Sequence, residues 1–193
     1  MIGVIGGSGM YELKGLENPT KWNPKLTPYG KPSDSYIIGK NKSPDPHAIP
    51  IDLLHMHYAG TLHGVRVAFL ARHGQGHRLL PSEVPGRANI HGFKELGVKW
   101  LISVSACGSL AEELKPGHFA IPNGLFDRTS RGSTTFFGDG AVAHVSLADP
   151  FCGTLCKVSF SPYHHRNLGK NIKCTIKCML SNAHCPIYSA LII

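Results

Sequence analysis

Long apolar runs are missing from this chain of 193 residues. No stretch approaches the roughly 20 consecutive apolar residues of a membrane-spanning helix, and no basic segment precedes the apolar residues at the N-terminus. These absences argue against a membrane protein and against a secreted one. We therefore expect a soluble, cytoplasmic protein with no membrane partner. Its hydrophobic content of 42% suffices to bury the core of one domain.

Acidic residues are absent from the last 41 residues of the chain. Residues 153–193 carry a net charge of +5, whereas residues 1–152 carry 15 Lys and Arg against 12 Asp and Glu, a net charge of +3. Four of the six cysteines also follow residue 152. The total of +8 therefore marks a change of sequence type near residue 153. We predict that residues 1–152 form the N-terminal part of one domain and that residues 153–193 form a basic, cysteine-rich tail.

Three interpretations of this tail stay open. It can be non-native sequence from a misread exon or a shifted frame, which we favour because a second anomaly interrupts the chain at residues 40–60. It can be a metal site of histidine and cysteine, although the spacing completes no standard zinc pattern. It can be a basic arm for nucleic acid. We expect no nucleic-acid partner, because residues 1–152 are nearly charge-balanced.

The second anomaly, residues 40–60, has the character of an insertion. It holds three prolines and three histidines. Without it, the two flanking strands would be joined by a tight turn, so we predict an interrupted hairpin. The spacing of His47, His55 and His57 fits no standard metal site, and we expect exposed loop histidines and no bound metal.

Short apolar runs bounded by glycine and proline predict an α/β fold. We expect strands at residues 2–5, 35–38, 65–71, 100–104 and 119–122. The clearest helix is residues 88–96, with Ile90, Phe93 and Leu96 on one face and Gly97 as its stop signal. A strand follows directly, which is half of a βαβ unit. The sequence therefore predicts a mixed, mostly parallel twisted sheet flanked by helices.

The first predicted strand runs into a glycine-rich loop, Gly6-Gly7-Ser8-Gly9. Glycines let backbone N–H groups converge on an anion, and Ser8 adds a hydroxyl donor. The loop alone is a weak signal, because its spacing differs from the dinucleotide fingerprint and no Gly-Lys-Ser/Thr follows. A glycine-rich turn with no ligand is the competing interpretation.

Two further strand ends carry groups that suit the same anion. Arg72 and His73 follow the strand at 65–71, and Ser105 and Ala106 follow the strand at 100–104. In open α/β sheets, ligands bind at the carboxyl ends of the strands. The guanidinium of Arg72 matches phosphate oxygens, and His73 adds a second donor. We predict that these groups and Ser8 form a pocket for one inorganic phosphate. A Ser-His-Asp hydrolase is excluded, because neither Ser105 nor Ser109 lies in G-x-S-x-G.

Several motifs in this order resemble the methylthioadenosine phosphorylase branch of the purine nucleoside phosphorylases. They cover residues 1–152 apart from the insertion: IGVIGGSG, GKPSD, ARHG, PSEVPGRANIHGFKELGV, SVSACGSL, PGHFAIPNGLFDRT, FFGDG and AHVSLADPFC. The resemblance implies a trimeric α/β enzyme that cleaves the glycosidic bond of 5′-methylthioadenosine, or a close purine nucleoside, with inorganic phosphate as co-substrate and no cofactor. It implies that Ser8, Arg72, His73, Ser105 and Ala106 contact the phosphate. It also implies that His144 reaches into the 5′ pocket of a neighbouring subunit.

The resemblance ends at residue 152. The family continues with motifs that hold the ribose and with aspartates that face the purine, and residues 153–193 contain neither. We therefore expect a phosphorylase whose C-terminal part is missing and whose activity is impaired. The alternative is a catalytically inactive phosphate-binding subunit that assembles with intact phosphorylase. The sequence does not distinguish adenine from 6-oxopurine substrates.

Overall fold

The computed structural model describes residues 1–7, 10–11, 16–24, 26–41, 65–116, 118–127, 135–157, 172–174 and 188–192. The chain forms two units, Met1–Ser103 and Val104–Ile193. Ser8 and the three histidines of the insertion lie outside the described residues, as does most of the tail. The interpretations of the tail and of residues 42–64 therefore stay predictions.

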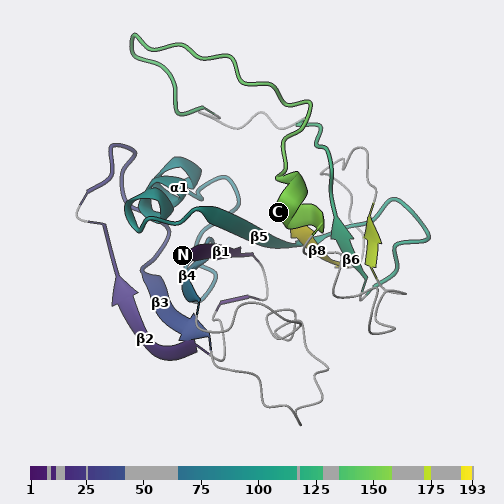
Figure 1. The fold of residues 1–193 in the computed structure, drawn as a ribbon, viewed down its shortest axis with the longest axis horizontal. Helices are drawn as coiled ribbons and strands as arrows, with labels where there is room; N and C mark the ends of the chain where they lie inside the picture. The colour runs from purple at the N-terminus through teal and green to yellow at the C-terminus, as the bar shows by residue number, and fades with distance from the viewer. Residues whose placement is uncertain are drawn as a thin grey trace. The chain divides into compact units, whose positions relative to one another are not determined.

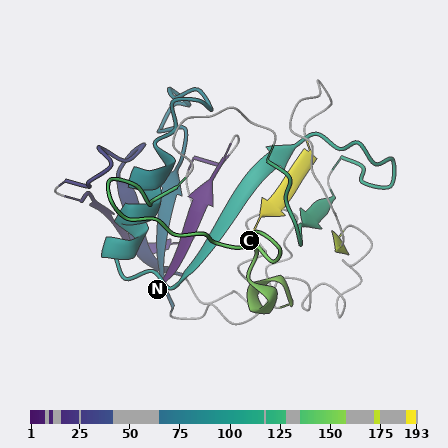
Figure 2. The same cartoon turned by 90° about the horizontal axis from the view of Figure 1, so that it is seen from above.

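The first unit is built on a mixed sheet. Strand β1, Ile2–Gly6, pairs in parallel with β4, Arg66–Ala71. Strand β3, Tyr36–Asn41, pairs antiparallel with β4, and β2, Leu16–Trp22, pairs antiparallel with β3. The order in the sheet is β2-β3-β4-β1-β5-β8, where β5 is Trp100–Cys107 and β8 is Tyr188–Ile192 (Figure 1 and Figure 2). The mixed α/β sheet that the sequence predicts is confirmed.

The central strands are apolar on both faces, and their side chains alternate between two core clusters. Ile5, Ala68 and Leu70 join Tyr36 and Phe93 in one cluster. The second cluster contains Val4, Val67, Phe69 and Ala71. Strands β1 and β4 are therefore fixed from both sides, which makes their carboxyl ends a rigid platform.

Helix α1, Gly86–Glu95, supplies Phe93 to the first cluster. It ends as the sequence predicts: Gly97 has a φ of +73°, its N–H donates to Lys94 O at 3.0 Å, and the N–H of Val98 donates to Phe93 O at 3.0 Å. This pattern is a Schellman motif. The predicted face is wrong at Ile90, which is 37% exposed. The buried residues are Ala88, Asn89, Gly92 and Phe93, because a polar contact of Asn89 sets the rotation of the helix.

Strand β2 is not among the predicted strands, because Pro19 interrupts its sequence and Gly15 precedes it. It lies at the end of the sheet order, where a proline costs no ladder hydrogen bond to a further strand. The pairing with β3 shifts register between Glu17 and Thr20, and Asn18 has a φ of 46°. A β-bulge at this point accommodates Pro19.

The two strands that flank the insertion, β3 and β4, pair antiparallel, as the sequence predicts for a hairpin. Residues 37–40 of β3 lie antiparallel to residues 66–69 of β4, so Lys40 stands opposite Arg66. This pairing runs from Ile37 and Phe69 to Lys40 and Arg66, so the first residue of the predicted insertion still belongs to the ladder.

Two predictions concern the second unit. Strand β6, Phe119–Ile121, agrees with the strand expected at 119–122, and it pairs in parallel with β7, Ile172–Cys174. Strand β5 is longer than predicted: it continues past Val104 to Cys107. In the sheet order β5 lies between β1 and β8, so it has a hydrogen-bonded neighbour on each side.

No helix in the part of the chain that the structure describes is long and apolar enough to cross a membrane.

Candidate functional site

The first two of the three predicted strand ends meet at one edge of the sheet. Gly6, the last residue of β1, stands opposite Ala71, the last residue of β4. The ladder continues one step further, because the N–H of Arg72 donates to Gly6 O at 3.0 Å. Parallel pairing thus brings the glycine loop and the Arg72-His73 pair together, although more than 60 residues separate them in the sequence.

The guanidinium of Arg72 packs directly against Gly7. A Cβ atom added at Gly7 would lie 2.6 Å from one terminal nitrogen of Arg72, 2.7 Å from the other and 2.8 Å from Cζ. Only glycine permits this approach. A permanent positive charge therefore lies beside the loop whose backbone is predicted to bind an anion.

His73 is buried, with 4% of its surface exposed, and both of its ring nitrogens are engaged. Nδ1 lies 2.9 Å from the carbonyl oxygen of Leu79, and Nε2 lies 3.2 Å from Nε of Arg72, which donates to it. The N–H of Leu79 returns a bond to His73 O at 3.0 Å. Burial lowers the pKa of His73; the positive charges of Arg72 and His77 lower it further, against the opposing effect of the Leu79 bond.

A second histidine, which the sequence reasoning missed, extends this arrangement. His77 stacks on His73 with ring centroids 4.5 Å apart. The hydroxyl of Tyr11 lies 2.9 Å from Nδ1 of His77. Tyr11 stands two residues after the glycine-rich segment, so this bond ties the chain that follows β1 to the loop after β4. The G-x-G-H spacing after Arg72-His73 is a sequence signal, but nothing in it indicates the partner.

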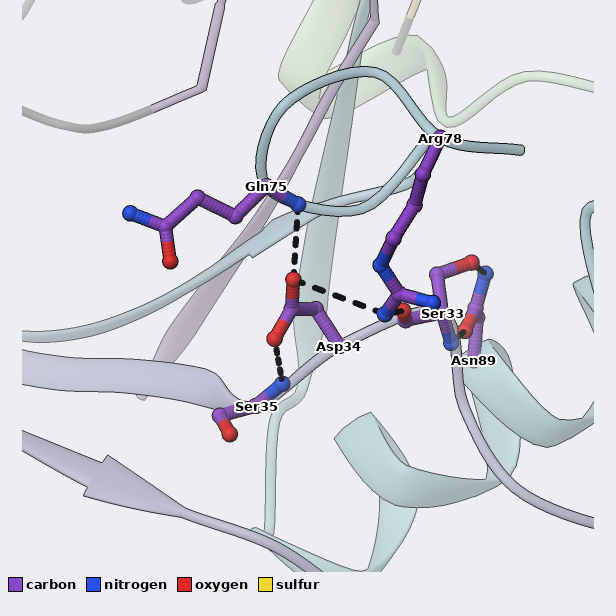
Figure 3. Close-up of polar contacts among 6 residues, drawn as sticks. All are labelled: Ser33, Asp34, Ser35, Gln75, Arg78 and Asn89. Carbon is purple, nitrogen blue, oxygen red and sulfur yellow. Dashed lines mark hydrogen bonds and ion pairs between the residues drawn. The ribbon is translucent and has the colours of Figure 1, made fainter.

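The GKPSD segment contacts the loop after β4 through Ser33 and Asp34 (Figure 3). Asp34 accepts hydrogen bonds from the N–H of Gln75 at 2.7 Å and from that of Ser35 at 2.7 Å. Arg78 lies 3.8 Å from the same carboxylate and donates to Ser33 O at 2.5 Å. A negative carboxylate and a cation thus fix the residues that follow His73. We name these contacts of Asp34, Gln75 and Arg78 the Asp34 clamp.

The clamp is anchored in the core through Asn89 of α1. Its Oδ1 accepts from the N–H of Ser33 at 2.8 Å, and its Nδ2 donates to Ser33 Oγ at 2.9 Å. Asn89 is fully buried and Ser33 is 1% exposed, so both polar side chains need these partners. Figure 3 shows Ser33 and Asn89 beside Arg78. These contacts connect helix α1 with the Asp34 clamp and with the loop after β4.

The other predicted site residues belong to the second unit. Ser105 and Ala106 lie within the last residues of β5, half-buried, near its carboxyl end. His144 is exposed and lies in an extended segment after residue 141. The structure therefore brings Arg72 and His73 together with Gly7, and it describes Ser105, Ala106 and His144 in the other unit.

Comparison with known proteins identifies the family. A family model described as the phosphorylase superfamily matches residues 54–180, which is more than half of the chain. The chain belongs to the phosphorylase superfamily. Within this superfamily, a relative from Koribacter versatilis named S-methyl-5′-thioadenosine phosphorylase is 50% identical over 157 residues, 81% of this chain and 46% of the relative. A protein of the same name from Chloroflexus aurantiacus is 51% identical over 158 residues, which is 81% of this chain and 47% of the relative.

Solved phosphorylases share the fold. A methylthioadenosine phosphorylase from an antarctic soil metagenomic library superposes with a TM-score of 0.71 at 34% identity, covering 100% of this chain and 71% of that chain. A double mutant of adenosine/methylthioadenosine phosphorylase from Schistosoma mansoni, solved with adenine, gives a TM-score of 0.65 at 31% identity, covering 86% of this chain and 51% of that chain. This superfamily member spans about half the length of the curated relatives that it matches.

Proposed function

We propose that this chain binds inorganic phosphate as the nucleophile of a purine nucleoside phosphorylase. The observation that carries the proposal is the guanidinium of Arg72 packed against Gly7 at the shared carboxyl edge of β1 and β4. A cation beside a glycine loop matches the charge of a phosphate ion. The relatives named S-methyl-5′-thioadenosine phosphorylase support 5′-methylthioadenosine, or a related purine nucleoside, as the substrate.

The reaction exchanges one bond at the anomeric carbon. A phosphate oxygen forms a bond to C1′, the bond from C1′ to the purine nitrogen breaks, and the purine leaves with that electron pair and takes up a proton. The products are the free purine and a pentose 1-phosphate. The transition state resembles a cation at C1′, so catalysis depends on holding the phosphate below C1′ and on stabilising the departing purine. Arg72 and the loop N–H groups perform the first task.

The phosphate site that we propose comprises Ser8, Arg72, His73, Ser105 and Ala106, with His73 acting through Arg72 because both of its ring nitrogens are engaged. His144 would enter the 5′ pocket of a neighbouring subunit in a homotrimer. No cofactor takes part, since phosphate itself is the co-substrate. We place the protein in the cytoplasm, in purine and methionine salvage.

The tail lacks the acidic residues that we expect to perform the second task. Residues 153–193 contain no Asp or Glu, and stabilising a departing purine needs a proton donor or a hydrogen-bond partner near the ring. We therefore propose that this 193-residue chain binds phosphate but cleaves nucleosides far more slowly than its longer relatives. The same observation favours the second candidate, an inactive subunit that assembles with intact phosphorylase.

The test measures binding and turnover separately. Equilibrium dialysis with inorganic phosphate is expected to show saturable binding that the Arg72→Ala variant weakens roughly tenfold or more, because a charge-assisted contact is lost. Adenine release from 5′-methylthioadenosine is expected to fall well below that of the Koribacter versatilis relative. Absent phosphate binding would overturn the function, and turnover equal to that relative would overturn the impairment. Co-purification with an intact phosphorylase would select the inactive subunit.

A further inference from the structure

The hydrogen bonds of His73 define which ring nitrogen carries the proton. Leu79 O can only accept, so Nδ1 of His73 is the protonated nitrogen. Nε–H of Arg72 can only donate, so Nε2 of His73 carries the lone pair. The buried ring is thus neutral. Its one acceptor atom, Nε2, receives the hydrogen bond of Arg72, and its one N–H, at Nδ1, is bonded to Leu79 O, so neither nitrogen is left to donate to a ligand.

This bond has a consequence for the orientation of Arg72. Its Nε faces His73, while its two terminal nitrogens and Cζ lie against Gly7. A guanidinium is planar, so fixing Nε fixes the direction of the other nitrogens. We propose that His73 is a positioning residue for the phosphate site: as a neutral acceptor it turns Arg72 toward the glycine loop. This role rests on the proposed function, because it concerns the same anion.

The surroundings of the imidazole make its protonation unfavourable for this role. Arg72 faces one edge of the ring, His77 stacks on its face, Tyr11 hydrogen-bonds to His77 on the far side, and Leu79 O faces Nδ1. Adding a proton at Nε2 would place two donors, each on a cation, against one another. The bond to Nε would break, and Arg72 would turn away from Gly7.

The role predicts the sign of a pH effect. A histidine that donates directly to the anion would bind it more tightly when protonated, because it gains charge. A histidine that positions Arg72 as an acceptor would weaken anion binding when protonated. Burial lowers the pKa of His73, so this loss occurs on the acid side of an ordinary histidine titration.

The test uses sulfate, an anion whose own charge does not change between neutral and mildly acidic pH. Calorimetric titration of the full chain is expected to give a sulfate Kd that rises roughly tenfold on acidification, as for one lost charge-assisted bond. The His73→Gln variant is expected to lose this pH dependence. The matched His118→Gln variant, which changes a histidine of the second unit, is expected to retain it. Tighter or unchanged binding in acid would overturn the positioning role.

A second measurement needs no ligand. Nitrogen-15 shifts of the histidine rings at neutral pH are expected to show His73 protonated at Nδ1, assigned by the signal that disappears in His73→Gln. A proton on Nε2, with phosphate binding intact, would contradict the positioning role alone. A chain that binds no phosphate at neutral pH would contradict both this role and the proposed function.

Discussion

At the scale of single residues, the contact between Gly7 and Arg72 is the most sensitive point of the site. The guanidinium occupies the space that any side chain at position 7 would need. This explains physically why a glycine is required there, beyond the flexibility of a turn. A substitution at this position acts on the direction of one charge and leaves the core untouched.

We expect Gly7→Ala to weaken phosphate binding roughly tenfold while the folded state stays intact, since the new methyl group would displace the guanidinium. Equilibrium dialysis measures the binding, and circular dichroism verifies the fold. Gly124→Ala is the control, because a Cβ at Gly124 meets no atom within 4 Å. Unchanged phosphate affinity in Gly7→Ala would show that Arg72 does not hold the anion from this position.

The Asp34 clamp gives a second expectation at this scale. Asp34→Ala leaves the N–H groups of Ser35 and Gln75 without their acceptor, so we expect a loss of about 1–3 kcal/mol in the free energy of unfolding and weaker phosphate binding. Arg78→Ala is expected to cost less than about 1 kcal/mol, because the Arg78 side chain is 57% exposed in its pair with Asp34. Urea unfolding compares the two variants. Equal losses would contradict this ranking.

The pH dependence of stability follows from His73. Its pKa is lowered in the folded state by burial, so the unfolded chain binds more protons in mild acid. We expect stability to be full above the ordinary histidine pKa and to decline as pH falls toward the lowered folded value. Urea unfolding over this range is expected to show a smaller acid loss for His73→Gln than for the wild-type chain. An identical acid loss in both would rule out His73 as its source.

At the scale of elements, helix α1 packs closely against strand β3 where Gly92 meets the ring of Tyr36. The Tyr36 ring lies against Gly92, where an added Cβ would collide with the hydroxyl. That hydroxyl donates to Asn89 O at 2.7 Å, and the ring packs edge-on against Phe93 with centroids 4.9 Å apart. Burial, together with the negative charge of Glu95, raises the pKa of Tyr36. The phenol therefore stays neutral and keeps its proton for Asn89.

We expect Gly92→Ala to destabilise the protein by about 1–3 kcal/mol, because a rigid ring must move to admit a methyl group. Gly86→Ala is the matched control in the same helix: a Cβ there meets nothing within 4 Å, and alanine favours helix. Chemical denaturation of both variants distinguishes packing from propensity. Equal free energies of unfolding for the two variants would mean that the ring of Tyr36 moves aside without destabilising the protein.

The elements also show where sequence reasoning succeeds. The strands at 2–5, 65–71 and 119–122, the hairpin around the insertion and the end of the helix at Gly97 depend on local patterns, and the structure confirms them. Strand β2 and the full length of β5 depend on neighbouring strands, so local patterns did not reveal them. Ile90 was misplaced because the polar pair Asn89 and Ser33, and not apolar spacing alone, sets the helix face.

At the scale of the whole molecule, the chain combines a sheet edge that carries part of the proposed phosphate site with a tail of different composition. The first unit contains Gly7, Arg72, His73 and the Asp34 clamp. The chain spans about half the length of the curated relatives that it matches. We therefore expect binding of phosphate and cleavage of a nucleoside to be separable in this chain.

Replacing residues 153–193 by the C-terminal half of the Koribacter versatilis relative is expected to restore phosphate-dependent adenine release from 5′-methylthioadenosine. The graft would supply the purine side of the site, while this chain supplies Arg72. The same chimaera with Arg72→Ala serves as the control and is expected to be nearly inactive. A folded chimaera that releases no adenine would mean that residues 1–152 no longer form a competent phosphate site.

The sequence by itself determined the strands at 2–5, 65–71 and 119–122, the helix end and the set of residues that suit a phosphate, because these depend on neighbours along the chain. Only the tertiary structure decided how they act. The Asp34 clamp joins residues 41 positions apart and the Asn89 anchor joins residues 56 positions apart. The contact of the Arg72 guanidinium with Gly7 forms only when β1 and β4 pair in parallel, and the protonated nitrogen of His73 is set by its bonds to Leu79 O and Arg72 within the folded loop after β4. The glycine loop, which is a weak motif in the sequence, therefore acquires a neighbouring positive charge only on folding.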